Sequence, residues 1–159
     1  MKIFISHQQA DQVLASTIAR RLATTHQIDT YLDVIDAQLA KAGEHIGDYL
    51  RREMGKCTQL IAVVSTNTKY SSWVPWEIGI ATEKDFPLAT YVGDQTTPPE
   101  FLQKWPVLKS VEDVDKYAVA SNASTRASKS ERGLLTEDSA SRRSSTQEFF
   151  RTLRASLRQ

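Results

Sequence analysis

The sequence predicts an α/β domain of the flavodoxin-like class, in which helices cover both faces of a five-stranded parallel sheet of order 2-1-3-4-5. Short apolar segments alternate along the chain with longer segments in which apolar residues recur every three or four positions. Strands that alternate with helices of this length are joined by right-handed crossovers, so they run parallel in one sheet. The chain has 159 residues, of which 40% are hydrophobic, enough for one core of this size.

The apolar segments place the individual elements. The expected strands are residues 3–5, 28–32, 60–64, 88–92 and 107–111. A first helix is expected after Asp11, whose side chain is a suitable cap. Its residues Leu14, Ile18 and Leu22 fall four apart on one face. Later helices are expected over about 44–54 and 76–83, with a short helical piece near 101–105.

The composition changes towards the C-terminus and divides the chain into three parts. Residues 1–117 form the expected domain core. Residues 118–146 are rich in serine and charged residues and contain few large apolar ones, so they bury too little surface to offset the entropy of ordering. We therefore expect a flexible insertion there. Residues 147–159 have Phe149, Leu153 and Leu157 at helical spacing, which predicts a final amphipathic helix that packs on the same domain.

Charge and cysteine content exclude several classes of function. The 20 basic and 19 acidic residues give a net charge of +1, so neither nucleic acid nor a membrane surface is an expected partner. No apolar run is long enough to span a bilayer, and the N-terminal residues read as a strand, so we expect a cytoplasmic protein. The single cysteine, Cys57, excludes an internal disulfide, and the three histidines lack metal-ligand spacing, so no metal site is expected.

Polar residues follow the first three predicted strands. Ser6 and His7 follow the first strand, Asp33 the second and Ser65 the third. In such a sheet, ligands bind beyond the carboxyl ends of the strands, between the first and third, where the strand order reverses. These residues are therefore candidates for ligand contacts. Each also has a structural explanation, because Ser6 could cap a helix, Asp33 could form a turn and Ser65 could bond to the nearby backbone.

The segment 70–77 places one carboxylate and two indoles at the start of the third helix. Glu77 is the candidate catalytic residue, although the helix dipole also favours an acidic residue in a first turn. We expect Trp73 to form a wall of the site and Trp76 to pack in the interior. Gly43 precedes a helix, where it relieves backbone strain and secondarily shapes the neighbouring loop.

Five short motifs, in this order, resemble the signature motifs of a TIR (Toll/interleukin-1 receptor) domain of the stand-alone bacterial kind. They are residues 2–7 with Asp11, 31–34, 42–43, 64–65 and 72–77. The resemblance covers residues 1–117, with 147–157 as a final helix. It implies the same five-stranded sheet and, for many bacterial, plant and neuronal members, cleavage of NAD+ at its nicotinamide glycosidic bond. NAD+ is then a substrate, and no permanently bound cofactor is expected.

The resemblance also implies roles for particular residues. The catalytic glutamate of those members ends a Trp-x-x-x-Glu pattern, which corresponds to Trp73 and Glu77. Residues 33–43 resemble the family's loop that gates the site and contributes to self-association. Ser6, His7, Asp33, Gly43, Ser65 and Trp73 are the expected NAD+ contacts.

Three hypotheses about function follow. The first is a NAD+-cleaving TIR enzyme that makes a nucleotide signal for a separate effector protein, as in anti-phage defence of the Thoeris type. The second is a non-catalytic scaffold that binds other TIR domains. The third is an enzyme resembling the nucleoside deoxyribosyltransferases, which combine a related sheet with a glutamate nucleophile.

Overall fold

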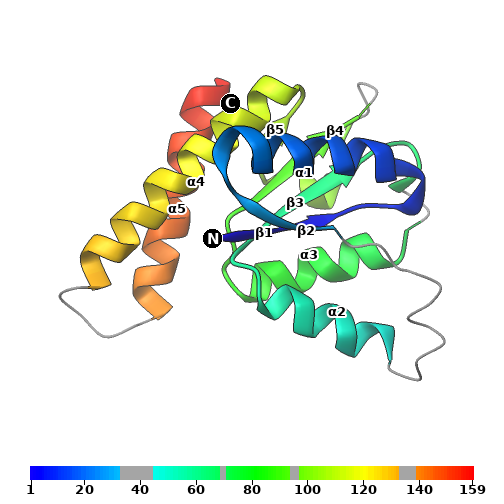
Figure 1. Ribbon diagram of the computed structural model, residues 1–159, viewed down its shortest axis with the longest axis horizontal. Helices are drawn as coiled ribbons and strands as arrows, with labels where there is room; N and C mark the ends of the chain where they lie inside the picture. Colours follow the sequence, from blue (N-terminus) through cyan, green and yellow to red (C-terminus); the bar gives the residue numbers. More distant parts are fainter. Residues whose placement is uncertain (33–44, 69–70, 94–96, 133–138) are drawn as a thin grey trace.

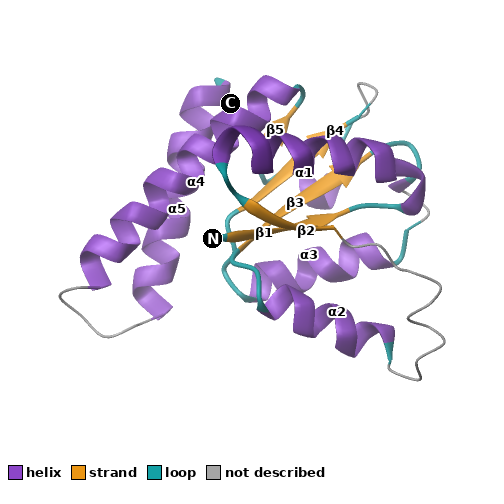
Figure 2. Cartoon of the chain, in the orientation of Figure 1, coloured by secondary structure: helices purple, strands orange, loops and turns teal. Residues whose placement is uncertain are grey.

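The computed structural model describes residues 1–32, 45–68, 71–93, 97–132 and 139–159 (Figure 1). Its sheet consists of β1 (Lys2–Ser6), β2 (Asp29–Leu32), β3 (Gln59–Val64), β4 (Leu88–Val92) and β5 (Val107–Leu108). The strands are parallel and lie in the order β2-β1-β3-β4-β5, which confirms the predicted topology (Figure 2). The order reverses between β1 and β3, so the expected switch point exists.

Helices cover both faces of this sheet. They are α1 (Gln12–His26), α2 (Ile46–Gly55), α3 (Trp73–Glu83), α4 (Val111–Arg132) and α5 (Ser139–Leu157), with short 3-10 helices η1 (Gln9–Asp11) and η4 (Glu100–Leu102). Helix α1 lies on one face, and α2 and α3 lie on the other (Figure 1). Helices α4 and α5 lie side by side and extend past the edge of the sheet.

Alternation of side chains along the strands creates two apolar clusters. Ile3 and Ile5 face the helices α1, α4 and α5, whereas Phe4 between them faces α2 and α3. The same alternation in β3 sends Ile61 and Val63 to the first cluster. All six residues of β3 are buried, as expected of a central strand covered on both faces.

Serine explains two of the boundaries that differ from the sequence expectation. Helix α3 begins at Trp73 rather than Trp76, because the Ser71 hydroxyl accepts a hydrogen bond from the Val74 amide at 3.2 Å. Pro75 is then in the first turn, where its missing N–H costs little. Strand β5 ends at Leu108, because Ser110 starts α4 by accepting the Asp113 amide at both its carbonyl and its hydroxyl oxygen.

The segment 118–146, where composition favours a flexible insertion, is mostly helical in the structure. Small residues rather than large ones form its buried side, including Ala118, Ala120 and Ser121. The Ser124 hydroxyl donates to the Ser145 carbonyl at 2.9 Å, across the two helices. Counting large apolar side chains misses an interface of this kind, in which small side chains let two backbones approach closely.

Several contacts attach helix α5 and the residues that follow it to the rest of the domain. Thr146 and Arg143 donate to the carbonyl (2.8 Å) and carboxylate (3.1 Å) oxygens of Asp85, which follows α3. Phe149 and Leu153 are buried in the first apolar cluster, as their helical spacing predicts. The Gln159 side chain pairs with both backbone groups of Val107 at the outer edge of β5. Among the described residues, no helix is both long enough and apolar enough to cross a membrane.

Candidate functional site

Ser6 and Glu77 meet at the switch point. Ser6 is the last residue of β1, and its hydroxyl donates to Oε2 of Glu77 on α3. Both side chains are fully buried. A carboxylate on the buried side of a helix, among Val74, Ile78 and Ala81, is costly unless it is hydrogen-bonded. The structure therefore brings together the two residues expected to follow the first strand and to end the Trp-x-x-x-Glu pattern.

The earlier start of α3 changes the electrostatic surroundings of Glu77. Glu77 is the fifth residue of the helix rather than a member of its first turn. The helix dipole acts mainly on the first turn, so it favours the ionised form of Glu77 less than a helix starting at Trp76 would. Glu77 therefore lies beyond the first turn, where the sequence analysis placed it, and the Ser6 hydroxyl donates one hydrogen bond to its carboxylate.

The two tryptophans occupy different places around the start of α3. Trp73 lies four residues before Glu77 and therefore on the same side of the helix, about 6 Å nearer its N-terminus. Trp73 is half-buried and packs against the second apolar cluster. Trp76 does not pack in the interior as expected, because it is 37% exposed. It meets Trp73 edge-on at 5.6 Å and lies against Gly47 of α2. Of the two, Trp73 is thus the one aligned with Glu77.

A second polar cluster joins the ends of β1 and β3. The Ser65 hydroxyl donates to Oδ2 of Asp11 at 2.8 Å, and the Asn67 amide group donates to Oδ1 at 3.4 Å. Ser65 also accepts the backbone N–H of Asn67 at 3.0 Å, which is the local bond anticipated from the sequence. Thr68 completes the turn by accepting the Ser65 backbone N–H at 3.0 Å.

Asp11 has a different role from the one predicted. Its carboxylate makes no capping bond to α1, because both oxygens face the turn after β3. Sequence reasoning treated Asp11 as a helix cap and did not identify it as part of the site. Its position among the short motifs was the available signal, but the partner across 54 residues could not be inferred from spacing.

His7 is turned away from the Ser6–Glu77 pair. Its Nδ1 donates to the Ile5 carbonyl at 3.1 Å, and its Nε2 lies 2.8 Å from the Gln12 side-chain oxygen. Both ring nitrogens are thus engaged within the first residues of the chain, and the side chain is buried. Asp33 and Gly43 lie outside the described residues. Among those described, no three His, Cys, Asp or Glu side chains form a group that could hold a metal.

Cys57 is the only thiol in the chain, and its surroundings make it unreactive. It is buried, and its Sγ lies 3.6 Å from the Glu53 carbonyl. Burial raises the pKa of the Cys57 thiol to about 11, so the nucleophilic thiolate is scarce at neutral pH.

The fold and this edge define a class of protein: a doubly wound α/β domain with a buried carboxylate at the switch point of its sheet. The sequence pattern of the TIR domain family matches residues 3–121, three quarters of the chain. The chain belongs to the TIR domain family, which confirms the resemblance seen in its motifs. No curated protein matches the chain.

Proposed function

We propose that this TIR domain cleaves NAD+ between nicotinamide and ribose, with Glu77 as the catalytic carboxylate. The observation that carries the proposal is the buried pair of Ser6 and Glu77 at the switch point of the sheet. An apolar residue at position 77 would pack there at lower cost, so a retained carboxylate favours a functional role. Family membership supports the proposal, because TIR domains include NAD+-cleaving enzymes.

One carboxylate suffices for this chemistry. When the bond between the ribose and the pyridinium breaks, positive charge moves from the ring to the sugar, and nicotinamide leaves as a neutral molecule. No acid has to protonate the leaving group, unlike in ordinary glycoside hydrolysis. An ionised Glu77 would stabilise the developing charge on the ribose or orient the attacking group. Attack by water gives ADP-ribose, nicotinamide and a proton, whereas attack by an internal nucleophile gives a cyclic product.

The burial of Glu77 makes a prediction about regulation. Its side chain is 0% exposed, so a ribose can reach it only after this edge of the sheet opens. We therefore expect low basal activity that rises when the protein assembles, since TIR domains generally self-associate. In this proposal Trp73, one turn before Glu77, forms the wall against which the substrate lies. Asp33, Gly43, Ser65 and His7 remain proposed contacts, although His7 would have to release its present partners.

The test compares Glu77→Gln with Glu83→Gln, which changes an exposed residue of the same helix. Each purified protein is incubated with NAD+ over a range of protein concentrations, and products are separated by liquid chromatography and identified by mass spectrometry. Wild type and Glu83→Gln should release nicotinamide, and Glu77→Gln should lose at least 100-fold (~3 kcal/mol of transition-state stabilisation). Full activity of Glu77→Gln would refute the assignment.

A non-catalytic scaffold is the second candidate, and the complete burial of Glu77 favours it. In that role the Ser6–Glu77 hydrogen bond would only hold α3 against β1. The wild type would then release no nicotinamide even at concentrations where it is fully assembled. Glu77→Gln would assemble as the wild type does.

The wider role that we propose is a nucleotide signal for a separate effector protein in the cytoplasm, in anti-phage defence. Its test adds the small-molecule fraction from infected cells that carry wild type or Glu77→Gln to a responsive effector. Only the wild-type fraction should activate it.

A further inference from the structure

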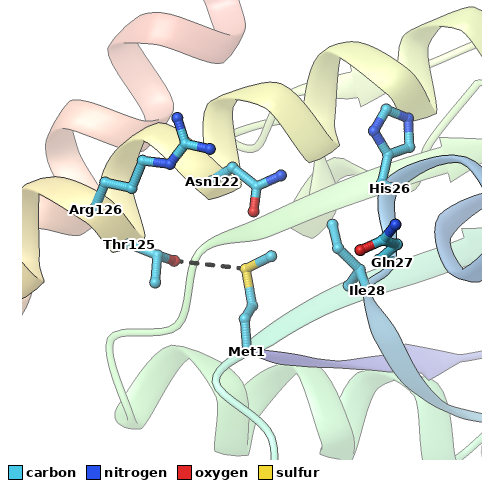
Figure 3. Close-up of a pocket in the computed structure, with 7 residues that line it drawn as sticks. All are labelled: Met1, His26, Gln27, Ile28, Asn122, Thr125 and Arg126. Carbon is cyan, nitrogen blue, oxygen red and sulfur yellow. Dashed lines mark hydrogen bonds between the residues drawn. The ribbon is translucent and has the colours of Figure 1, made fainter.

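A polar cavity of about 240 Å³ lies at the amino end of the sheet (Figure 3). Glu77 lies near the opposite, carboxyl end of the strands. His26, Gln27 and Ile28 line it from the end of α1, and Asn122, Thr125 and Arg126 line it from α4. Met1, just before β1, lies between these two walls. This cavity plays no part in the chemistry proposed for Glu77.

We propose that this cavity binds a small molecule through an anionic group, a phosphate or a carboxylate. Its lining contains two basic residues, His26 and Arg126, and no carboxylate. The acidic residue that His26 contacts is Asp115, at 2.7 Å, and Asp115 is also held by two N–H groups of Arg21 at 2.9 and 2.7 Å. The charge of Asp115 is thus already compensated, and the cavity is left with a positive balance.

The cavity also gathers polar side chains that have no partner among the described residues. Within the described part of the chain, the side chains of Gln27, Asn122 and Arg126 make no hydrogen bond or ion pair with other residues. Arg126 offers a fork of N–H groups that matches the geometry of phosphate and carboxylate oxygens. The amides of Asn122 and Gln27 add further N–H donors. The charge of Arg126 favours an anion, and the two neighbouring amides can add hydrogen bonds to it.

Met1, which lines the cavity, belongs to a hydrogen-bond network that reaches the buried side chain of Gln59. Sδ of Met1 accepts from Nε2 of Gln59 at 3.3 Å and from the Thr125 hydroxyl at 3.5 Å. Oε1 of Gln59 in turn accepts from the hydroxyls of Tyr117 (2.9 Å) and Ser121 (2.8 Å). The network connects Met1 and β3 with α4, and the bonds from Arg21 and His26 to Asp115 connect the end of α1 with α4, so both walls are held in place without a ligand. A preformed site loses less entropy on binding than one that must be ordered.

The partial negative charge at the C-terminus of α1 repels an anion in the cavity, but this repulsion is weaker than the attraction from Arg126. A helix C-terminus is equivalent to about half a negative charge, whereas Arg126 carries a full positive charge. The carbonyls of Leu22 and Ala23 in the last turn already accept the backbone N–H groups of Ile28 (3.1 Å) and Gln27 (3.2 Å). Their partial charges are therefore partly compensated before a ligand enters.

The test is a titration of the full chain, labelled with ¹⁵N, with inorganic phosphate and separately with acetate, at constant ionic strength set with sodium chloride. The proposal expects saturable shifts of the side-chain amide signals of Gln27 and Asn122. Arg126→Ala should weaken binding about tenfold, the loss of one charge-assisted hydrogen bond. Arg51→Ala, which changes an exposed arginine of α2, should bind as the wild type does.

Two further results complete the test. Asn122→Asp changes one amide to a carboxylate of the same size and should abolish anion binding if the cavity is the site. Saturation by phosphate alone would assign a phosphate-bearing ligand, and saturation by both probes would include carboxylates. Shifts that do not saturate, or that persist in both Arg126→Ala and Asn122→Asp, would overturn the proposal. The readout involves no NAD+ and is independent of the function proposed for Glu77.

Discussion

The hydroxyl of Ser6 donates a hydrogen bond to the buried carboxylate of Glu77, which joins the end of the first strand to a helix 71 residues further along the chain. This contact ties the carboxylate proposed for catalysis to the central part of the sheet. It also means that any change at Ser6 acts on Glu77 directly.

Ser6→Ala should destabilise the protein by about 1–3 kcal/mol, because Glu77 loses a buried donor. Urea unfolding measures the change, and Ser72→Ala, at an exposed position that makes no capping bond, should stay within ~0.5 kcal/mol of the wild type. The double variant Ser6→Ala with Glu77→Gln should cost less than the sum of the two single variants. Strict additivity would show that the two side chains are not coupled.

Asp11→Ala should also lower stability by about 1–3 kcal/mol, because the buried Ser65 hydroxyl loses its acceptor. Thermal unfolding measures this change. Asp29→Ala removes an exposed carboxylate at the opposite end of the sheet and serves as the control. Equal melting temperatures for Asp11→Ala and the wild type would contradict the cross-link described between η1 and the turn after β3.

The Asp115 cluster predicts a pH dependence of stability. Hydrogen bonds from Arg21 and then His26 lower the pKa of Asp115 from 3.8 to about 2. A pKa lowered by folding stabilises the folded state above the unfolded value, and this contribution is lost as the pH falls from about 4 towards 2. Asp115→Asn should therefore flatten the fall in stability within this window.

Arg21→Gln should also reduce the loss of stability between pH 4 and pH 2, because it removes the hydrogen bond that contributes most to the lowered pKa of Asp115. Melting temperatures between pH 2 and pH 7 measure both variants. The side chain of Asp115 is 26% exposed, so solvent screening limits the size of the effect. If the melting temperatures of both variants fell between pH 4 and pH 2 as steeply as those of the wild type, the Asp115 cluster would not be the source of the pH dependence.

Gln159→Ala should remove the two hydrogen bonds that the Gln159 side chain makes with the outer edge of β5. The Gln159 side chain accepts from the Val107 amide at 2.9 Å and donates to the Val107 carbonyl at 2.7 Å, as a neighbouring strand would. Amide hydrogen exchange at Val107 should accelerate, while global stability changes by only about 0.5–1.5 kcal/mol because the contact is exposed. Gln147→Ala, which changes an exposed residue of α5, is the control. Unchanged exchange at Val107 would show that this contact does not protect the strand.

The sheet and the helices α1 to α3 could be predicted because each of these elements carries its own periodicity. The buried run 60–64 and the alternation of Ile3, Phe4 and Ile5 specify a covered central sheet without knowledge of any partner. The start of α3 could not be placed in this way, because it depends on one hydroxyl, that of Ser71. The same limitation applies to the tail, where small buried side chains carry almost no hydrophobic signal.

The candidate site could be predicted only in part. Ligands of parallel sheets bind at the carboxyl ends of the strands, and Ser6 and Ser65 could be placed at that edge because the apolar runs show where β1 and β3 end. The orientation of a side chain at that edge does not follow from boundaries. His7 is adjacent to Ser6 but bonds back to Ile5, and Asp11 points to Ser65 instead of α1.

The position of Phe149 and Leu153 in the first apolar cluster matters for how the protein is shortened for laboratory work. Both lie beyond residue 121, where the family pattern ends, yet Phe149 packs edge-on against Tyr117, with ring centres 5.3 Å apart. A recombinant fragment trimmed at that boundary would expose this aromatic surface to water and would tend to aggregate. Fragments meant for crystallisation or binding assays should therefore keep both C-terminal helices.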